Sequence, residues 1–234
     1  MILNYKNEII HIEVVRSKRT TLCISIRDDE KVLVKAPLFL NEDKIREILE
    51  KKAEWILEKK KEVHKVQEKK ISRNYENGST LPYLGREYPM EIVIGKKASV
   101  SFEEEKFVIV LSEKKQDEES LKGLLKKWYK KQTLDMTTKR AADYARQMNV
   151  SVTSISIKSR KKQWGTCDNK GNLTFNWRLS MASPEAMDYV VVHELCHRQY
   201  MDHSKQFWGQ VKQILPDYKR YQIWLEENSI NMNL

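Results

Sequence analysis

The sequence predicts an α+β protein. Two observations predict this class: the first half alternates short β-forming runs with turns, and the second half is dominated by helical spacing of apolar residues. With 234 residues, of which 40% are hydrophobic, the chain is long enough to bury a sizeable core. A charged segment at residues 113–119 divides a predicted N-terminal β-rich module with one long helix, residues 1–115, from a C-terminal module, residues 116–234.

The N-terminal module begins with strands. Residues 8–36 contain the runs EIIHIEVV, LCISIR and VLVKA, and the polar turn at residues 28–30 between the last two is typical of a hairpin. Asn41 is a suitable N-cap for one long helix that extends to about Lys70. Residues 81–111 then predict further strands, with the runs MEIVI, ASVSF and KFVIVL.

The C-terminal module is mainly helical. A long helix is expected over residues 120–149, followed by a strand at 152–158, a basic loop at 159–171 and a strand at 172–179. Ser183 and Pro184 then suit the N-cap and first position of a helix that ends near Tyr200. After a helix break at residues 202–204, two more helices complete the chain, and no internal repeat is visible.

Composition and charge indicate which partners and which cellular compartment to expect. The formal net charge is +10 and the isoelectric point is about 9.3, which favours acidic partners such as nucleic acid or nucleotides. The lysines, however, are spread in pairs and triples as on solvated helix faces. No apolar stretch approaches the ~20 residues of a membrane span. With only three scattered cysteines and no secretion signal, we expect a cytoplasmic protein without a membrane partner.

The segment His-Glu-Leu-Cys-His at residues 193–197 contains the candidate metal ligands and the candidate general base. Two histidines four residues apart lie on one face of a helix, so His193 and His197 can bind the same metal ion. Glu194 lies about one 100° step round the helix, where its carboxylate can reach a metal-bound water and act as a general base.

A catalytic zinc ion usually has three protein ligands and one open position, and His203 supplies the third. It lies just beyond the predicted helix break, so the chain can turn back towards the metal. The protein has five histidines, and three of them fall within residues 193–203. Cys196 and Cys167 are expected to be small buried thiols, because an added thiolate would close the open position.

Several neighbours are candidates for supporting roles. Arg160, Lys161 and Lys162 could place positive charge at the mouth of the cleft, or form only an exposed loop. Asn176 could hydrogen-bond across the site or simply end a strand. The second ring nitrogens of the histidines also need partners. The candidates for that role are Asp188 and Asp202.

The flanking residues extend the motif. Trp164-Gly165-Thr166-Cys167, Lys170-Gly171, Asn176-Trp177-Arg178-Leu179, Asp202-His203-Ser204 and Phe207-Trp208 surround the histidine helix in order. With these flanks, residues 158–226 resemble the YgjP-like family of zinc-dependent metallohydrolases, relatives of SprT-like metallopeptidases. The resemblance implies a zincin-like catalytic module, with Zn²⁺ bound by His193, His197 and His203 and with Glu194 as the general base.

The leading hypothesis is therefore a zinc-dependent metallopeptidase that acts on a peptide or protein substrate. One alternative is a metal-dependent nucleoside triphosphate pyrophosphatase or phosphohydrolase, although the sequence has no Gly-rich phosphate loop and only one visible metal site. Another is a nucleic-acid-binding protein with a structural metal, or a weak association of the enzyme with nucleic acid through its basic surface. The oligomeric state is left open, and another divalent ion could occupy the same ligands.

Overall fold

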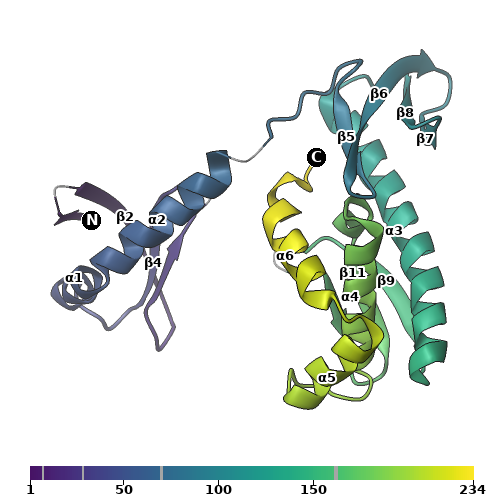
Figure 1. The fold of residues 1–234 in the computed structure, drawn as a ribbon. Helices are drawn as coiled ribbons and strands as arrows, with labels where there is room; N and C mark the ends of the chain where they lie inside the picture. The colour runs from purple at the N-terminus through teal and green to yellow at the C-terminus, as the bar shows by residue number, and fades with distance from the viewer. Residues whose placement is uncertain (7, 28, 69–70, 161–162) are drawn as a thin grey trace. The chain divides into compact units, whose positions relative to one another are not determined.

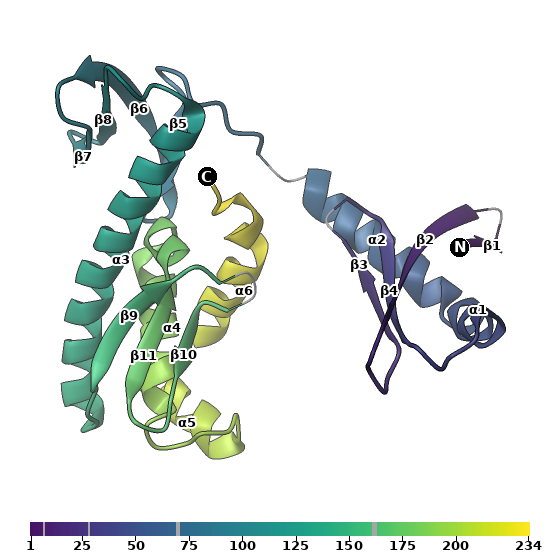
Figure 2. The same ribbon diagram turned by 180° about the vertical axis from the view of Figure 1, so that it is seen from behind.

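The computed structural model describes residues 1–6, 8–27, 29–68, 71–160 and 163–234. Figures 1 and 2 show helices and sheets in both parts of the chain, which confirms the α+β class. The chain forms two compact units, Met1–Ile71 and Ser72–Leu234.

The division between the units falls at residues 71/72, whereas the charge pattern predicted it at 115/116. The reason is that the strands of residues 80–112 bury side chains such as Leu81, Phe107 and Ile109 in the same core as the later helices. The charged segment instead starts a helix within the second unit, since the Asp117 carboxylate accepts a hydrogen bond from the backbone N–H of Ser120 at 2.8 Å.

In the first unit, one face of a four-stranded sheet is covered by helices. The strands are β1 (Ile2–Tyr5), β2 (Glu8–Ser17), β3 (Cys23–Ile26) and β4 (Val32–Pro37), and the helices are α1 (Glu42–Lys51) and α2 (Ala53–Glu68). The strand order is β1-β2-β4-β3, with β2 and β4 parallel. Ile10 and Val34 from the sheet and Leu49 from α1 are fully buried in the core.

The single helix predicted from Asn41 to about Lys70 is two helices in the structure. Asn41 does cap the first, accepting a hydrogen bond from the backbone N–H of Lys44 at 2.9 Å. Lys52 then lies outside the helical region, with φ −105° and ψ 4°, and α2 begins at the next residue. Apolar spacing does not reveal this break, because Leu49, Ala53 and Ile56 stay on the buried side across it.

The second unit contains a four-stranded sheet with the same topology as the sheet of the first unit, although no internal repeat is visible in the sequence. Its strands are β5 (Thr80–Tyr83), β6 (Arg86–Gly95), β7 (Ser99–Glu103) and β8 (Lys106–Ser112), in the order β5-β6-β8-β7. In both sheets the central pair is parallel and the two outer pairs are antiparallel. The first hairpins match closely: Leu3 and Tyr5 of β1 occupy the positions of Leu81 and Tyr83 in β5.

The remainder of the second unit builds the candidate site around a long helix and a small sheet. Its elements are α3 (Glu118–Met148), β9 (Ser154–Lys158), β10 (Gly165–Cys167), β11 (Asn172–Asn176), the 3₁₀ helix η1 (Trp177–Met181), α4 (Pro184–Cys196), α5 (Lys205–Ile214), α6 (Tyr218–Asn228) and η2 (Ser229–Asn231). The sheet has the order β10-β11-β9, so β10 is an edge strand. Figure 2 shows this sheet beside α3 and α4.

Two predictions for this region need correction. The strand predicted at 172–179 stops at Asn176, because the Asn176 side chain caps η1 by accepting a hydrogen bond from the backbone N–H of Arg178 at 3.3 Å. The helix predicted to end near Tyr200 ends at Cys196, and His197 is its C-cap.

The sheet of β5 to β8 is attached to η1, just before α4, through the turn between β5 and β6. The backbone N–H groups of Leu84 and Gly85 donate to the carbonyls of Ser180 and Met181, both at 3.0 Å. Gly85 has a φ of +81°, and a Cβ there would lie 3.0 Å from Ser183, the N-cap of α4. The turn therefore requires glycine for both its conformation and its close approach.

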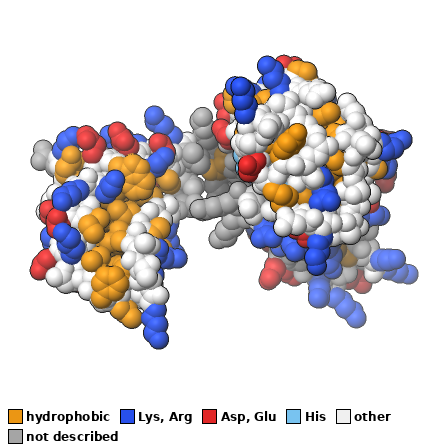
Figure 3. All heavy atoms as spheres, turned by 90° about the horizontal axis from the view of Figure 1, so that it is seen from below, with side chains coloured by type: hydrophobic (Ala, Val, Ile, Leu, Met, Phe, Trp, Pro, Cys, Tyr) orange, Lys and Arg blue, Asp and Glu red, His pale blue; other side chains and the backbone are white. Residues whose placement is uncertain are grey.

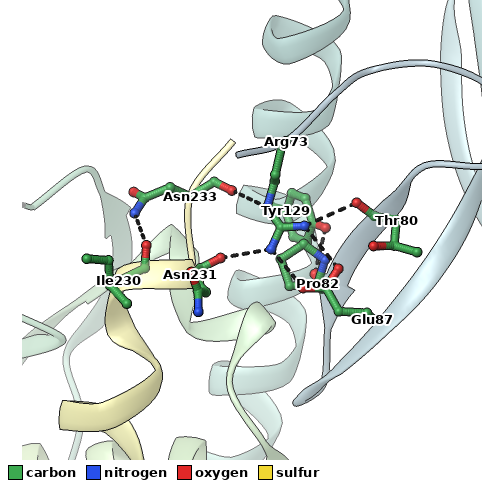
Figure 4. Close-up of polar contacts among 8 residues, drawn as sticks. All are labelled: Arg73, Thr80, Pro82, Glu87, Tyr129, Ile230, Asn231 and Asn233. Atoms are coloured by element: carbon green, nitrogen blue, oxygen red, sulfur yellow. Dashed lines mark hydrogen bonds and ion pairs between the residues drawn. The ribbon is translucent and has the colours of Figure 1, made fainter. Parts of the chain in front are cut away.

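Arg73 joins the beginning of the second unit to its end (Figure 4). Its side chain is 7% exposed and forms a double hydrogen bond with the carboxylate of Glu87, at 2.7 and 2.9 Å. The same guanidinium donates to the carbonyls of Asn231 and Asn233 and of Thr80. The planar guanidinium has enough N–H donors to bind the carboxylate and these carbonyls at the same time. Arg73 therefore links the C-terminal segment to β5 and β6.

The surface carries scattered basic groups. On the face that Figure 3 shows, Lys and Arg side chains are dispersed over both units, and hydrophobic side chains gather on the first unit, the left-hand body. Among the described residues, no helix combines the length and apolar character needed to cross a bilayer.

Candidate metal centre

Helix α4 places the central residues of the site. Ser183 caps it by accepting a hydrogen bond from the backbone N–H of Ala186 at 3.2 Å, and Pro184 occupies its first turn, as predicted. The run Val190–Val192 is buried on all sides, which holds the helix rigidly inside the core. The following turn therefore presents His193 and His197 from a fixed backbone.

The structure brings the predicted third histidine to the other two. The Nε2 atoms of His193 and His203 lie 3.1 Å apart, and one ring nitrogen from each of His193, His197 and His203 lies within 4.8 Å of the others. Two nitrogens bound to one tetrahedral zinc ion, at roughly 2.0–2.1 Å each, lie about 3.3 Å apart. The separation of the first pair therefore fits a shared ion.

The loop that carries His203 is held by aromatic packing. The ring of Phe207 touches all three imidazoles, with centroid distances of 4.9, 4.7 and 4.8 Å. Trp208 stacks on His203 at 5.8 Å and 28°. Ser204 caps α5 directly after His203, so the restart of the helix fixes the returning loop.

The hydrogen bonds of the imidazoles differ from the prediction. His197 Nδ1 lies 3.0 Å from the carbonyl oxygen of Tyr200. A proton on Nδ1 can be donated to this carbonyl, which leaves the lone pair of Nε2 free to bind a metal ion. Asp188 instead pairs with Arg140 at 2.8 Å, and Asp202 accepts from the backbone N–H of Ser204. The end of α4 at Cys196 puts the Tyr200 carbonyl within reach, which the predicted longer helix would not have done.

The electrostatics of the site suit metal binding. Burial, together with the neighbouring imidazoles, lowers the pKa of His193 to about 3, and burial also lowers the pKa of His197. These rings are therefore neutral at pH 7 and keep lone pairs to offer. His193 Nδ1 is buried without a hydrogen-bond partner in the described part of the chain. Three imidazoles, two of them neutral at pH 7, form a donor set that fits zinc and related first-row ions.

Glu194 lines the same cleft as the histidines, as the motif predicted. The residue is 5% exposed, and burial raises the pKa of its carboxyl group to about 8. Gly165 of β10 lies directly against it, since a Cβ at Gly165 would come within 2.6 Å of Glu194 Oε1. The missing side chain of this glycine leaves the space that the carboxylate occupies.

The cleft has a volume of about 430 Å³ and runs between β10 and α4. Beside the predicted residues, it is lined by Gln163, Tyr189 and Met201, which sequence reasoning missed. Tyr189 could have been found, because it precedes His193 by four residues and so lies on the same helix face. Gln163 and Met201 lie in irregular segments, where periodicity gives no signal.

The remaining candidates are placed as follows. Cys196 is fully buried, and burial raises the pKa of its thiol to about 12. Cys167 is half-buried and lines the cleft, and burial raises its pKa too. Lys161 and Lys162 lie outside the described residues, and Arg160 is exposed.

Comparisons with known proteins identify the family of the chain. A model of the YgjP-like metallopeptidase domain matches residues 20–228, so the chain belongs to the YgjP-like metallopeptidase family. Membership implies a divalent metal ion and hydrolytic activity on peptide or protein substrates. The crystal structure of the metallopeptidase zymogen abylysin from Pyrococcus abyssi aligns with 42% of this chain and 99% of its own, at 20% identity and a TM-score of 0.37. No curated protein matches the chain.

Proposed function

We propose that this protein is a zinc-dependent peptidase in which His193, His197 and His203 hold the ion and Glu194 is the general base. The observation that carries the proposal is the convergence of three imidazoles in one cleft with the buried side chain of Glu194. Zinc is favoured over harder ions such as Mg²⁺ because all three donors are nitrogens.

A bound zinc ion would supply Lewis acidity and a water of lowered pKa. Glu194 would accept one proton from the attacking water, whose oxygen would form a bond to the carbonyl carbon of the substrate. The protonated carboxyl group of Glu194 would then pass this proton to the leaving nitrogen as the C–N bond breaks. The products are an amine and a carboxylic acid, and the second proton of the water, left on the acid, ionises to give a carboxylate and an ammonium group. The position of Glu194 suits this shuttle, because its carboxyl group lines the same cleft as the three imidazoles and is within reach of a water held there.

The edge strand β10 favours a polypeptide substrate over a nucleotide. Within the described chain, β10 pairs with β11 on one side only, through residues such as Thr166 and Thr174. Its other edge offers backbone N–H and C=O groups beside the cleft. An extended peptide can pair with such an edge, which would lay its backbone across the imidazoles.

Metal analysis combined with hydrolysis assays tests the proposal. The purified protein should contain close to one zinc per chain, cleave members of a mixed peptide library, lose activity to a chelator and regain it with zinc. Nucleoside triphosphates assayed in parallel should remain intact. Cleavage of triphosphates without cleavage of any peptide would overturn the peptidase proposal and favour the phosphohydrolase alternative.

A further inference from the structure

The segment that leads into β10 is fastened by one residue of β11. Three N–H groups of Asn176 donate to three carbonyl oxygens of this segment. The side-chain amide reaches Arg160 at 2.8 Å and Gln163 at 3.1 Å, and the backbone N–H reaches Trp164 at 2.8 Å. Gln163 and Trp164 both line the cleft. A single residue therefore holds the cleft wall at the point where it begins.

Every hydrogen-bonding group of the Asn176 side chain has a partner in this position. It is 5% exposed, and its oxygen caps η1 through the backbone N–H of Arg178. An amide has two donor hydrogens and an acceptor oxygen, and here each has a partner. Neither Asp, which has no donor when ionised, nor Ser, which is too short, reproduces this set.

The other end of β10 is held separately. Arg198, directly after the site helix, donates to the carbonyls of Asp168 and Asn169 at 3.4 and 3.2 Å. Between these two attachments lies Gly165, whose backbone closely approaches the carboxylate of Glu194. A displacement at the Asn176 end would therefore reach the proposed general base directly.

We propose that Asn176 is a positioning residue, which sets the place of β10 against Glu194 by holding the carbonyls of Arg160, Gln163 and Trp164. Its catalytic consequence rests on the peptidase function proposed above, but its structural consequence does not. Asn176 touches neither the metal ligands nor the reacting atoms in this account. It acts through the strand that forms the wall of the cleft.

The test compares Asn176→Asp with the matched control Asn228→Asp. Aspartate keeps the shape and the cap on η1 but loses both side-chain donors. Asn228 also donates its amide to a carbonyl, that of Trp224 at 2.8 Å, but within α6. The first measurement does not depend on activity. It is the rate at which Cys167 is alkylated, and peptide mass spectrometry distinguishes this cysteine from Cys23 and Cys196. The second measurement determines separately how kcat and KM change.

We expect Asn176→Asp to speed alkylation of Cys167 several-fold and to lower kcat by roughly 10–100-fold, with zinc content unchanged. The control should change neither. Unaltered alkylation and kcat in a folded Asn176→Asp protein would overturn the proposal. If the wild type cleaves no peptide, the peptidase function fails, while the alkylation result still decides the positioning role.

Asn176→Ser provides a second variant, since serine is a good N-cap and introduces no buried charge. It should behave like Asn176→Asp in both readouts. If both variants lose cooperative unfolding while Asn228→Asp retains it, Asn176 is a general scaffold residue and the positioning proposal is overturned.

Discussion

Gly165 in β10 lies against the carboxylate of Glu194 in α4, so closely that a Cβ on Gly165 would stand 2.6 Å from both Cγ and Oε1 of Glu194. Because Glu194 is buried, its carboxylate can yield to such a Cβ only by leaving its place in the cleft. This contact links the cleft wall to the proposed base.

Gly165→Ala is therefore expected to lower kcat by roughly 100-fold, since a displacement of about 1 Å in the base has an effect of that size, and to leave zinc content unchanged. Steady-state kinetics with metal analysis provide the measurement. Gly123→Ala is the control, because Gly123 is exposed on α3 with no atom within 4 Å of its added Cβ. Full activity of Gly165→Ala would contradict the account.

Removal of the base should separate chemistry from metal binding. Glu194→Gln keeps the size of the side chain but cannot accept the proton, so kcat should fall by about 10²–10⁴-fold while zinc is retained. Glu185→Gln, an exposed change in the first turn of the same helix, should leave kcat unaltered. A Glu194→Gln protein with wild-type kcat would rule out Glu194 as the base.

Loss of the third imidazole should weaken metal binding. His203→Ala removes the ligand that the loop after α4 provides, and we expect at least ~100-fold lower zinc affinity in a competition titration with a chelator. His64→Ala is the matched control, since His64 pairs with Glu30 in the first unit. Unchanged affinity in His203→Ala would exclude His203 from the metal centre.

Arg73 should matter for stability rather than for chemistry. Arg73→Ala leaves Glu87 and the carbonyls of the C-terminal segment without their donor, and we expect a loss of about 3 kcal/mol in the free energy of unfolding. Arg86→Ala, an exposed change in the same sheet, should stay within about 0.5 kcal/mol. Urea denaturation followed by tryptophan fluorescence measures both. Equal stability of the two variants would refute the role assigned to Arg73.

The candidate site could be predicted largely because its signals are local. Helix geometry alone makes His193 and His197 neighbours, and the break before Ser204 allows His203 to return. The hydrogen bond from His197 to the Tyr200 carbonyl could not be predicted in the same way. It depends on where α4 ends, and helix ends are set by tertiary packing as well as by local sequence.

The fold shows the same division between local and non-local information. Apolar spacing predicted α3 within two residues of its observed bounds, and the turn signals predicted the hairpin of β3 and β4. The parallel pairing of β2 with β4 and the shared topology of the two sheets were not predicted, because strand partners are chosen by packing across long stretches of chain.

X-ray absorption spectroscopy of the zinc-loaded protein tests the central claim most directly, because it reports the ligand atoms themselves. We expect three imidazole nitrogens and one oxygen at about 2.0–2.1 Å from the ion. A sulfur ligand at about 2.3 Å, or fewer than three imidazoles around the zinc ion, would contradict a centre built from His193, His197 and His203.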